Sequence, residues 1–185
     1  MAGILDGAVK NETVQMEDSG AIICGVYLTH NHTKKPVLLP FRLDTGADRT
    51  FMSIHRLIKD LGYTAKELKN IAEPYSGSTY LAGGKEFRAN YIKIPEIWFL
   101  GKCFYNCPVF IDANEDFEKI ENDILSGAVA IEDVPDNLLG LEIASQFIEV
   151  LDYERWRVDF YSIKKPAKDL CAKYSITVGS IKLNE

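Results

Sequence analysis

The residues best suited to chemistry are the five from Asp44 to Asp48, which read Asp-Thr-Gly-Ala-Asp. They follow an apolar, strand-like run from Val37 to Leu43, so we expect Asp44 to end a strand and begin a tight turn. A carboxylate in that position is held by the core and is still accessible. Two such carboxylates at hydrogen-bonding distance would share one proton and activate a water molecule, because they cannot both ionise easily. The chain contains one Asp-Thr-Gly, so the second carboxylate would come from a second copy.

Composition places the chain among ordinary globular proteins. Its 185 residues are 46% apolar and 26% charged, which fits one domain with a sizeable core. The net charge of −6 argues against nucleic acid as the main partner. No apolar run is long enough for a spanning helix, and the first residues lack the basic start of a signal peptide. We therefore expect a cytoplasmic protein without a membrane partner.

The four cysteines favour reduced thiols over a metal site. Cys103 and Cys107 form the one close pair. His30 and His32 lie far away in sequence, at a spacing unlike that of a second pair of zinc ligands. We expect no metal ion in this protein.

The apolar pattern predicts a mostly β chain with short helices. Glycines 83 and 84 lie in a stretch poor in large side chains, which is typical of a hairpin tip. The expected strands cover residues 21–29, 37–43, 87–94, 97–99, 104–111, 148–153 and 156–160, and the expected short helices cover 53–61 and 64–71.

The chain divides into a lead-in, one domain and an extension. Residues 1–18 are expected to be a polar N-terminal lead-in, 19–163 the domain, and 164–185 a C-terminal extension. Within the domain, the acidic stretch 113–133 has apolar residues at helical intervals. It is expected to form an inserted helix and loop on the surface.

Three segments, in this order, carry a resemblance to a known family. They are the strand that leads into Asp44 to Ala47, the stretch that contains Gly83 and Gly84, and residues 138–140 (Leu-Leu-Gly) before a short helix. This order resembles the retroviral-type (retropepsin-like) aspartic proteases, including their bacterial and archaeal relatives, over roughly residues 22–160. The resemblance implies a closed β-barrel of the acid-protease type, a homodimer with the active site on its two-fold axis, and a flap over a polypeptide substrate.

The resemblance also implies roles for individual residues. Asp44 would be the catalytic acid, and Thr45 would reach across the dimer to hold the two loops together. Gly46 would lie close to the substrate backbone, and Ala47 would pack beneath it. Asp48 would hold the substrate main chain.

Further residues follow from the same resemblance. Gly83 and Gly84 would belong to the flap, and Gly140 would let its strand pass tightly under the Asp44 loop. The reaction would need no metal ion and no organic cofactor.

The chain departs from the family pattern after Gly140. Relatives often have Arg or Asp there, and the Arg pairs with the acid that follows Asp-Thr-Gly-Ala, whereas this chain has Leu141 and Glu142. Asp48 would then need Arg42 or Arg49 as its partner, or it could cap the following turn instead. The sequence thus predicts an aspartic endopeptidase. The alternative is a non-proteolytic dimeric module of the same fold that binds peptides or serves as a scaffold.

Overall fold

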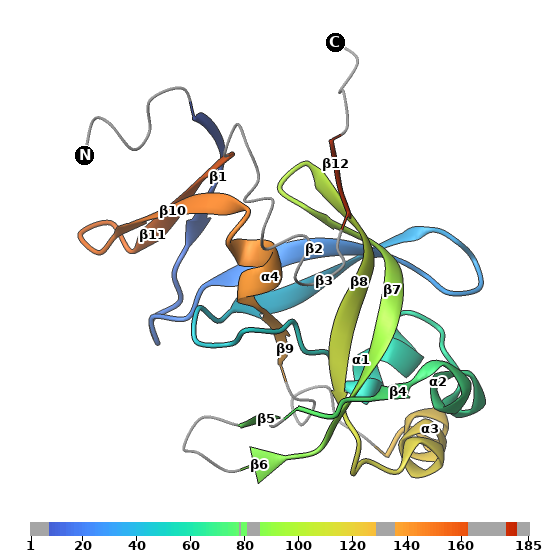
Figure 1. The fold of residues 1–185 in the computed structure, drawn as a ribbon. Helices are drawn as coiled ribbons and strands as arrows, with labels where there is room; N and C mark the ends of the chain where they lie inside the picture. The colour runs from blue at the N-terminus through green and yellow to red at the C-terminus, as the bar shows by residue number, and fades with distance from the viewer. Residues whose placement is uncertain (1–7, 78, 81–85, 129–135, 163–176, 181–185) are drawn as a thin grey trace.

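The computed structural model describes residues 8–77, 79–80, 86–128, 136–162 and 177–180. These residues form a mostly β structure with short helices (Figure 1). The strands are β1 (Val9–Gln15), β2 (Ile23–Thr29), β3 (Pro36–Leu43), β4 (Glu73–Pro74), β5 (Thr79–Tyr80), β6 (Glu86–Phe87), β7 (Ala89–Phe99), β8 (Lys102–Asp112), β9 (Asn137–Leu139), β10 (Phe147–Asp152), β11 (Arg157–Ser162) and β12 (Thr177–Ser180). The helices are α1 (Ile54–Lys59), α2 (Ala65–Ile71), α3 (Phe117–Ser126) and α4 (Leu141–Ala144).

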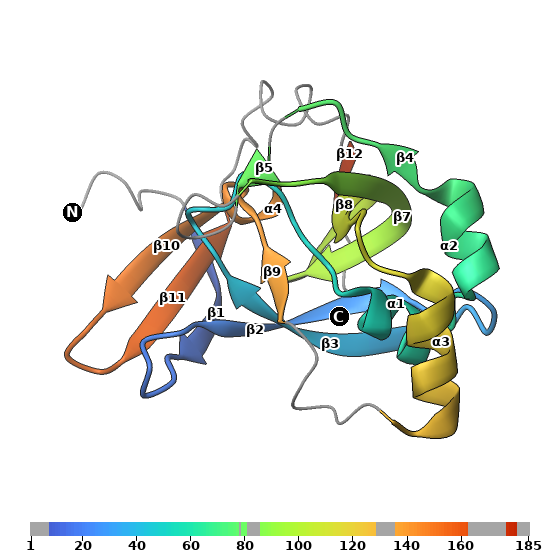
Figure 2. The ribbon, with the colours of Figure 1, turned by 90° about the horizontal axis from the view of Figure 1, so that it is seen from below.

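The strands form one large sheet and two small ones. The large sheet has seven strands in the order β12-β8-β7-β2-β3-β9, with β4 paired to β7. The small sheets are β1-β11-β10 and β5-β6. β9 runs parallel to the end of β3, and Figure 2 shows the two strands side by side. This parallel pair brings residues nearly a hundred positions apart in sequence to the same sheet edge.

The expectation of a closed β-barrel is wrong. Among the described residues no sheet closes on itself, and the large sheet ends at β12 on one side and at β9 on the other. Between β9 and β8 there are isolated bridges from Phe51 to Leu138 and Phe110 rather than a strand ladder. Alternation along a strand predicts which face is buried, but closure depends on pairing between distant segments. The sequence pattern therefore could not decide it.

The predicted hairpin that leads to Asp44 is confirmed. β2 and β3 pair antiparallel, with Val26 opposite Leu39. Along β2 the side chains of Cys24, Val26 and Leu28 are buried and alternate with exposed positions. This period of two is expected for a strand with one face on the core, and it sets the register with which β3 reaches its last residue.

The longest hairpin joins β7 and β8, where the sequence predicts two separate strands before the turn. The two segments are one strand, and its pairing with β8 continues on both sides of Pro95. Proline has no N–H to donate, and Asn106 at the corresponding position of β8 has a left-handed φ of 52°. The ladder therefore passes over a local irregularity instead of ending there.

Short helices cover one end of the large sheet. α1 buries Ile54, Leu57 and Ile58, as its spacing predicts. α2 begins with a capping box, in which the Thr64 hydroxyl accepts from the Glu67 N–H and the Glu67 carboxylate accepts from the Thr64 N–H. The buried apolar residues of both helices belong to the same core cluster as those of the large sheet.

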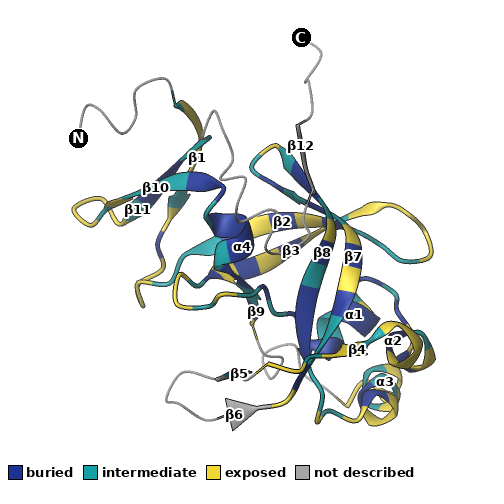
Figure 3. Ribbon diagram, in the orientation of Figure 1, coloured by how far each residue is buried: buried dark blue, intermediate teal, exposed yellow. Residues whose placement is uncertain are grey.

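The acidic stretch contains the expected helix, and that helix contributes to the core. α3 is capped by the Asp116 side chain and contacts α1 and α2. Its residues Phe117 and Ile120 are buried in the main apolar cluster. Figure 3 shows α3 at the edge of the molecule with exposed residues along its outer side. The remainder of the expected insert, residues 129–133, lies outside the described residues.

Both terminal segments contribute strands. In the expected lead-in, β1 pairs with β11, and the Lys10 ammonium lies 2.8 Å from the largely buried Asp159 carboxylate. In the expected extension, β12 pairs with β8. No helix in the described ranges is long and apolar enough to cross a membrane.

We expect Phe117→Ala to lower the free energy of unfolding by about 3 kcal/mol, because it removes a buried aromatic ring and leaves a cavity between helices. Phe117 is 5% exposed. Denaturant unfolding followed by circular dichroism would measure this loss.

Leu125→Ala on the same helix is the matched control, since Leu125 is 79% exposed. It should change the free energy of unfolding by less than about 0.5 kcal/mol. Equal losses in the two variants would contradict the packing of α3 described above.

Candidate active site

Asp44 is the first residue after β3, and backbone bonds hold it there. Its N–H donates to the Leu139 carbonyl oxygen over 3.1 Å, which continues the pairing of β3 with β9. Its Oδ1 accepts from the Gly46 N–H at 2.9 Å, and its carbonyl accepts from the Ala47 N–H at 3.1 Å. The carboxylate is thus held in a tight turn by its own loop, residues 44–50, which we call the Asp44 loop. The sequence prediction of a strand end followed by a turn is confirmed.

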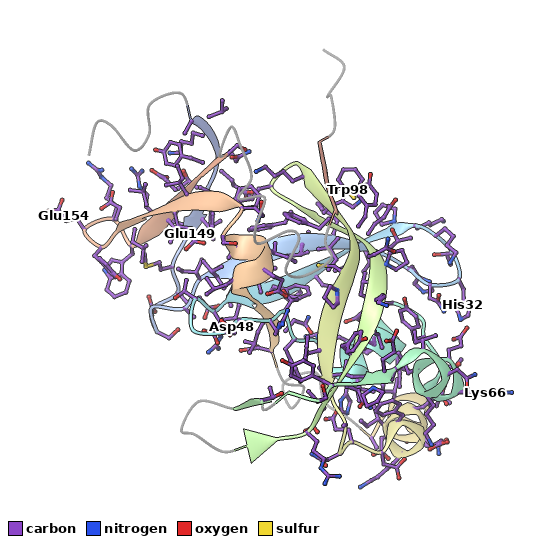
Figure 4. The ribbon with its side chains drawn as sticks, in the orientation of Figure 1. His32, Asp48, Lys66, Trp98, Glu149 and Glu154 are labelled. Atoms are coloured by element: carbon purple, nitrogen blue, oxygen red, sulfur yellow. The ribbon has the colours of Figure 1, made fainter. Side chains whose placement is uncertain are left out.

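The loop presents its polar residues to solvent. Thr45, Gly46 and Asp48 are exposed, whereas Asp44 and Ala47 are half-buried. Figure 4 shows Asp48 near the junction of β9 and α4. A Cβ on Gly46 would lie 3.2 Å from Asp44 Oδ1, so a larger residue there would crowd the carboxylate. Thr45, Gly46 and Asp48 therefore form the solvent-exposed side of the loop.

The opposite side of the loop is bound to the β9–α4 junction. The Leu141 N–H donates to the Ala47 carbonyl at 2.9 Å. The Gly140 N–H donates to the Thr50 hydroxyl oxygen at 3.1 Å, and both of these groups are buried. These bonds join Ala47, in the middle of the loop, and Thr50, at its end, to one short segment. Together with the bond from the Asp44 N–H to Leu139, they fix the position of the loop.

Residues 50–52 extend this attachment to the large sheet. Phe51 exchanges two backbone hydrogen bonds with Leu138, each of 2.9 Å. Phe110 of β8 donates to the Thr50 carbonyl at 2.8 Å and accepts from the Met52 N–H at 2.9 Å. The segment after the loop therefore lies between β8 and β9. The loop is held by β3, which leads into it, and by the hydrogen bonds of this segment to β8 and β9.

Gly140 is required by space and not by backbone conformation. Its φ of −85° and ψ of 173° are accessible to any residue. A Cβ at this position, however, would lie 2.2 Å from the Arg49 carbonyl carbon and 2.5 Å from its oxygen. The expectation that Gly140 lets its strand pass tightly under the Asp44 loop is confirmed.

Glu142 is a buried acid beneath the loop that the sequence did not single out as a site residue. It is 2% exposed, and its Oε1 accepts from the Thr50 backbone N–H. Burial raises the pKa of this carboxyl to about 7, although the hydrogen bonds from Thr50 and the positive charge of Arg49 act in the opposite direction. The sequence signal for a buried acid was its place within the apolar run 139–144, which reads Leu-Gly-Leu-Glu-Ile-Ala.

One of the two candidate partners of Asp48 pairs with another acid. Arg42 pairs with Asp136, with 2.6 Å between Nη2 and Oδ2. The Arg49 guanidinium lies 5.5 Å from the centre of the Phe110 ring, and its charge acts on Glu142. The structure thus does not bring Arg42 to Asp48, and the substrate-binding role of Asp48 stays a prediction.

Gly83 and Gly84 lie outside the described residues. The strands on either side of them, β5 and β6, pair antiparallel with Thr79 opposite Phe87, as expected for a hairpin. The assignment of the two glycines to a flap stays a prediction.

The cysteines that the structure describes lie in the interior, and Cys171 is outside the described residues. Cys24, Cys103 and Cys107 are buried free thiols, and burial raises the pKa of each. Within the described ranges no group of three or more His, Cys, Asp or Glu residues is placed to hold a metal ion.

Two comparisons with known proteins gave no match. No protein-family model matches this chain, and no curated protein matches it. The resemblance to aspartic proteases therefore stays a prediction from the sequence motifs.

We expect Gly140→Ala to displace the Asp44 loop and to lower the free energy of unfolding by about 1–3 kcal/mol, because the new methyl group would overlap the Arg49 backbone. Thermal unfolding would measure the loss of stability, and amide chemical shifts of residues 44–50 would report the displacement.

Gly127→Ala separates this overlap from ordinary glycine effects. Gly127 has a left-handed φ of 72° and nothing within 4 Å of an added Cβ. It should lose stability without any shift change in the Asp44 loop. A Gly140→Ala protein with unchanged loop shifts would argue against the close approach.

Proposed function

We propose that this protein is an aspartic endopeptidase that acts as a homodimer, with one Asp44 from each subunit in the active site. The observation that carries the proposal is the setting of Asp44, a half-buried carboxylate that a β-strand and the Gly140 junction hold in an otherwise exposed loop. A fixed carboxylate with an open side is what a symmetric pair requires. The exposed Thr45 and Gly46 are available for contact with a second loop.

The proposed reaction is hydrolysis of a peptide bond by an activated water molecule. The two Asp44 carboxyl groups share one proton, because like charges at that distance do not both ionise. The ionised one takes a proton from the water as the oxygen attacks the carbonyl carbon, and the protonated one donates a hydrogen bond to the carbonyl oxygen. Collapse of the intermediate breaks the C–N bond, and the amine nitrogen takes up the proton.

The remaining residues of the loop would bind the substrate. Gly46 has no side chain, so the backbone of a polypeptide can approach Asp44 closely. Ala47, whose carbonyl accepts from the Leu141 N–H, would pack beneath Gly46, and Asp48 would contact the substrate main chain. Gly83 and Gly84 would cover the substrate from the other side and keep bulk water away. This chemistry uses no metal ion and no organic cofactor.

The alternative is a dimeric peptide-binding or scaffold module without proteolytic activity. One observation favours it: Arg42, which could have supported Asp48, is engaged with Asp136. Without Arg42 beside it, Asp48 would depend on Arg49 to hold the substrate main chain in register with Asp44. The protease remains the better proposal, because a scaffold has no need of an accessible carboxylate held in this way.

A cytoplasmic location remains a prediction from the sequence. The buried free thiols of Cys24, Cys103 and Cys107 are consistent with a reducing compartment.

We expect Asp44→Asn to reduce cleavage of a peptide library by about a thousandfold or more, because an amide can neither share the proton nor deprotonate water. Mass spectrometry of the digest would measure cleavage, at mildly acidic pH where one acid of the pair stays protonated.

Glu154→Gln is the control, since Glu154 lies at the far end of the β10–β11 hairpin (Figure 4). It should cleave at the wild-type rate. Turnover by Asp44→Asn equal to that of the wild type would exclude Asp44 as the catalytic acid.

We also expect a dimer in solution, because one chain supplies half of the proposed site. Light scattering under assay conditions should give twice the 20.8 kDa mass of one chain, for the wild type and for Asp44→Asn. An active protein that stays monomeric at every concentration would rule out the symmetric site.

A further inference from the structure

Glu142 occupies a place that is unusual for an acid. It is the second residue of α4, directly below the Asp44 loop, and its neighbours Ile143 and Ala144 are also buried. A buried carboxyl is costly unless its oxygens find donors, so its partners decide what it does there.

One oxygen of Glu142 has a partner and the other does not. Oε1 accepts from the Thr50 N–H, and the Thr50 hydroxyl oxygen in turn accepts from the Gly140 N–H at 3.1 Å. Oε2 is buried and has no hydrogen-bond partner among the described residues. Thr50 and Glu142 thus connect the end of the Asp44 loop to α4 through buried groups.

The protonation state of Glu142 decides whether this arrangement is stable. In the neutral carboxyl, Oε1 accepts the Thr50 N–H and the unpartnered Oε2 carries the proton. In the ionised carboxyl, the negative charge would be shared by two buried oxygens, of which Oε2 has no hydrogen-bond partner among the described residues, and this is the more expensive state in a buried site. Ionisation therefore favours local opening that admits water to Oε2.

Two groups on neighbouring elements act on this carboxyl. Arg49 of the Asp44 loop favours the ionised form of Glu142 by its charge. Cys107 of β8 is a buried thiol whose pKa is raised, first by burial and then by Glu142. Desolvation of Glu142 outweighs the hydrogen bonds from Thr50 and the attraction to Arg49, and the pKa of about 7 agrees with a neutral carboxyl in the closed structure at acidic pH.

We propose that Glu142 is a positioning residue for Asp44: its neutral carboxyl holds the Thr50 end of the Asp44 loop against the β9–α4 junction, and its ionisation loosens that attachment. The role of Glu142 in peptide cleavage rests on the proposed function, whereas its role in attaching the loop does not.

The sign of the pH effect follows from the raised pKa. Between the ordinary range of a glutamate and about pH 7, the folded protein holds a proton on Glu142 that the unfolded chain has released. Stability from this group is therefore fully present at low pH and is lost as the pH rises toward 7. The Asp44 loop should become less protected over the same interval.

Amide hydrogen exchange tests the attachment without any need for activity. In the Asp44→Asn protein, corrected for the intrinsic pH dependence of exchange, protection of the Thr50 and Gly140 amides should fall about tenfold or more between about pH 5.5 and 8. The central amides of β7 should keep their protection. With Glu142→Gln added, the side chain stays neutral and protection of Thr50 should no longer depend on pH.

Glu115→Gln is the matched control, because Glu115 is another carboxyl whose pKa burial raises, but it lies between β8 and α3. It should retain the fall in protection at Thr50. The proposal is overturned if the Glu142→Gln background shows the same fall as its parent. If that variant does not fold, constant protection of Thr50 in the Asp44→Asn protein overturns it equally well.

Cleavage by proteins that retain Asp44 then separates this inference from the proposed function. On the alkaline side, kcat/KM should fall more steeply in the wild type than in Glu142→Gln, because ionisation of Glu142 adds to the loss of the proton shared by the Asp44 pair, and the acidic limb should be unchanged. Superimposable profiles would exclude a role of Glu142 in cleavage while the protease proposal stands. Absence of cleavage in both proteins would refute the protease, and exchange at Thr50 would still decide the role of Glu142 in the loop.

Discussion

The close approach of Gly140 to the backbone of Arg49 is the contact on which the rest of the site depends. There is no space for a Cβ between them, so the β9–α4 junction lies directly beneath the loop that begins at Asp44. At this distance the junction can exchange hydrogen bonds with Ala47 and Thr50, and the parallel pairing of β9 with β3 continues up to Asp44 itself. A larger residue than Gly140 would push the two segments apart and weaken all of these hydrogen bonds together.

This contact also divides the loop into two environments. On the exposed side, Thr45, Gly46 and Asp48 face solvent. On the buried side, Thr50 and Glu142 form a polar connection inside an apolar cluster. Buried polar groups of this kind specify one arrangement when all partners are present, and they become a source of instability when one group changes its charge. The site thus combines an accessible carboxylate with a titratable group in its support.

The sheets show how much of the architecture depends on distant pairing. β9 is three residues long and has no stability of its own, yet it carries the Gly140 junction and ends the large sheet beside β3. Phe51 bridges it to β8 without forming a ladder, so the sheet stays open. α3 illustrates the same principle. Its acidic composition indicated a surface segment, whereas Phe117 and Ile120 are buried because α3 packs against α1 and α2.

The sequence by itself determined the local features, because these depend on neighbours along the chain. It predicted the hairpin that ends at Asp44, the helix with Leu57 on its buried side, and the capping box at Thr64. The resemblance to a known family also implied that Gly140 lies under the loop, as the structure shows. Only the tertiary structure decided that the sheet stays open, that Arg42 turns to Asp136, and that Glu142 is buried with one unpartnered oxygen. Each of these depends on residues far apart in sequence, whose distance is set by packing and not by periodicity.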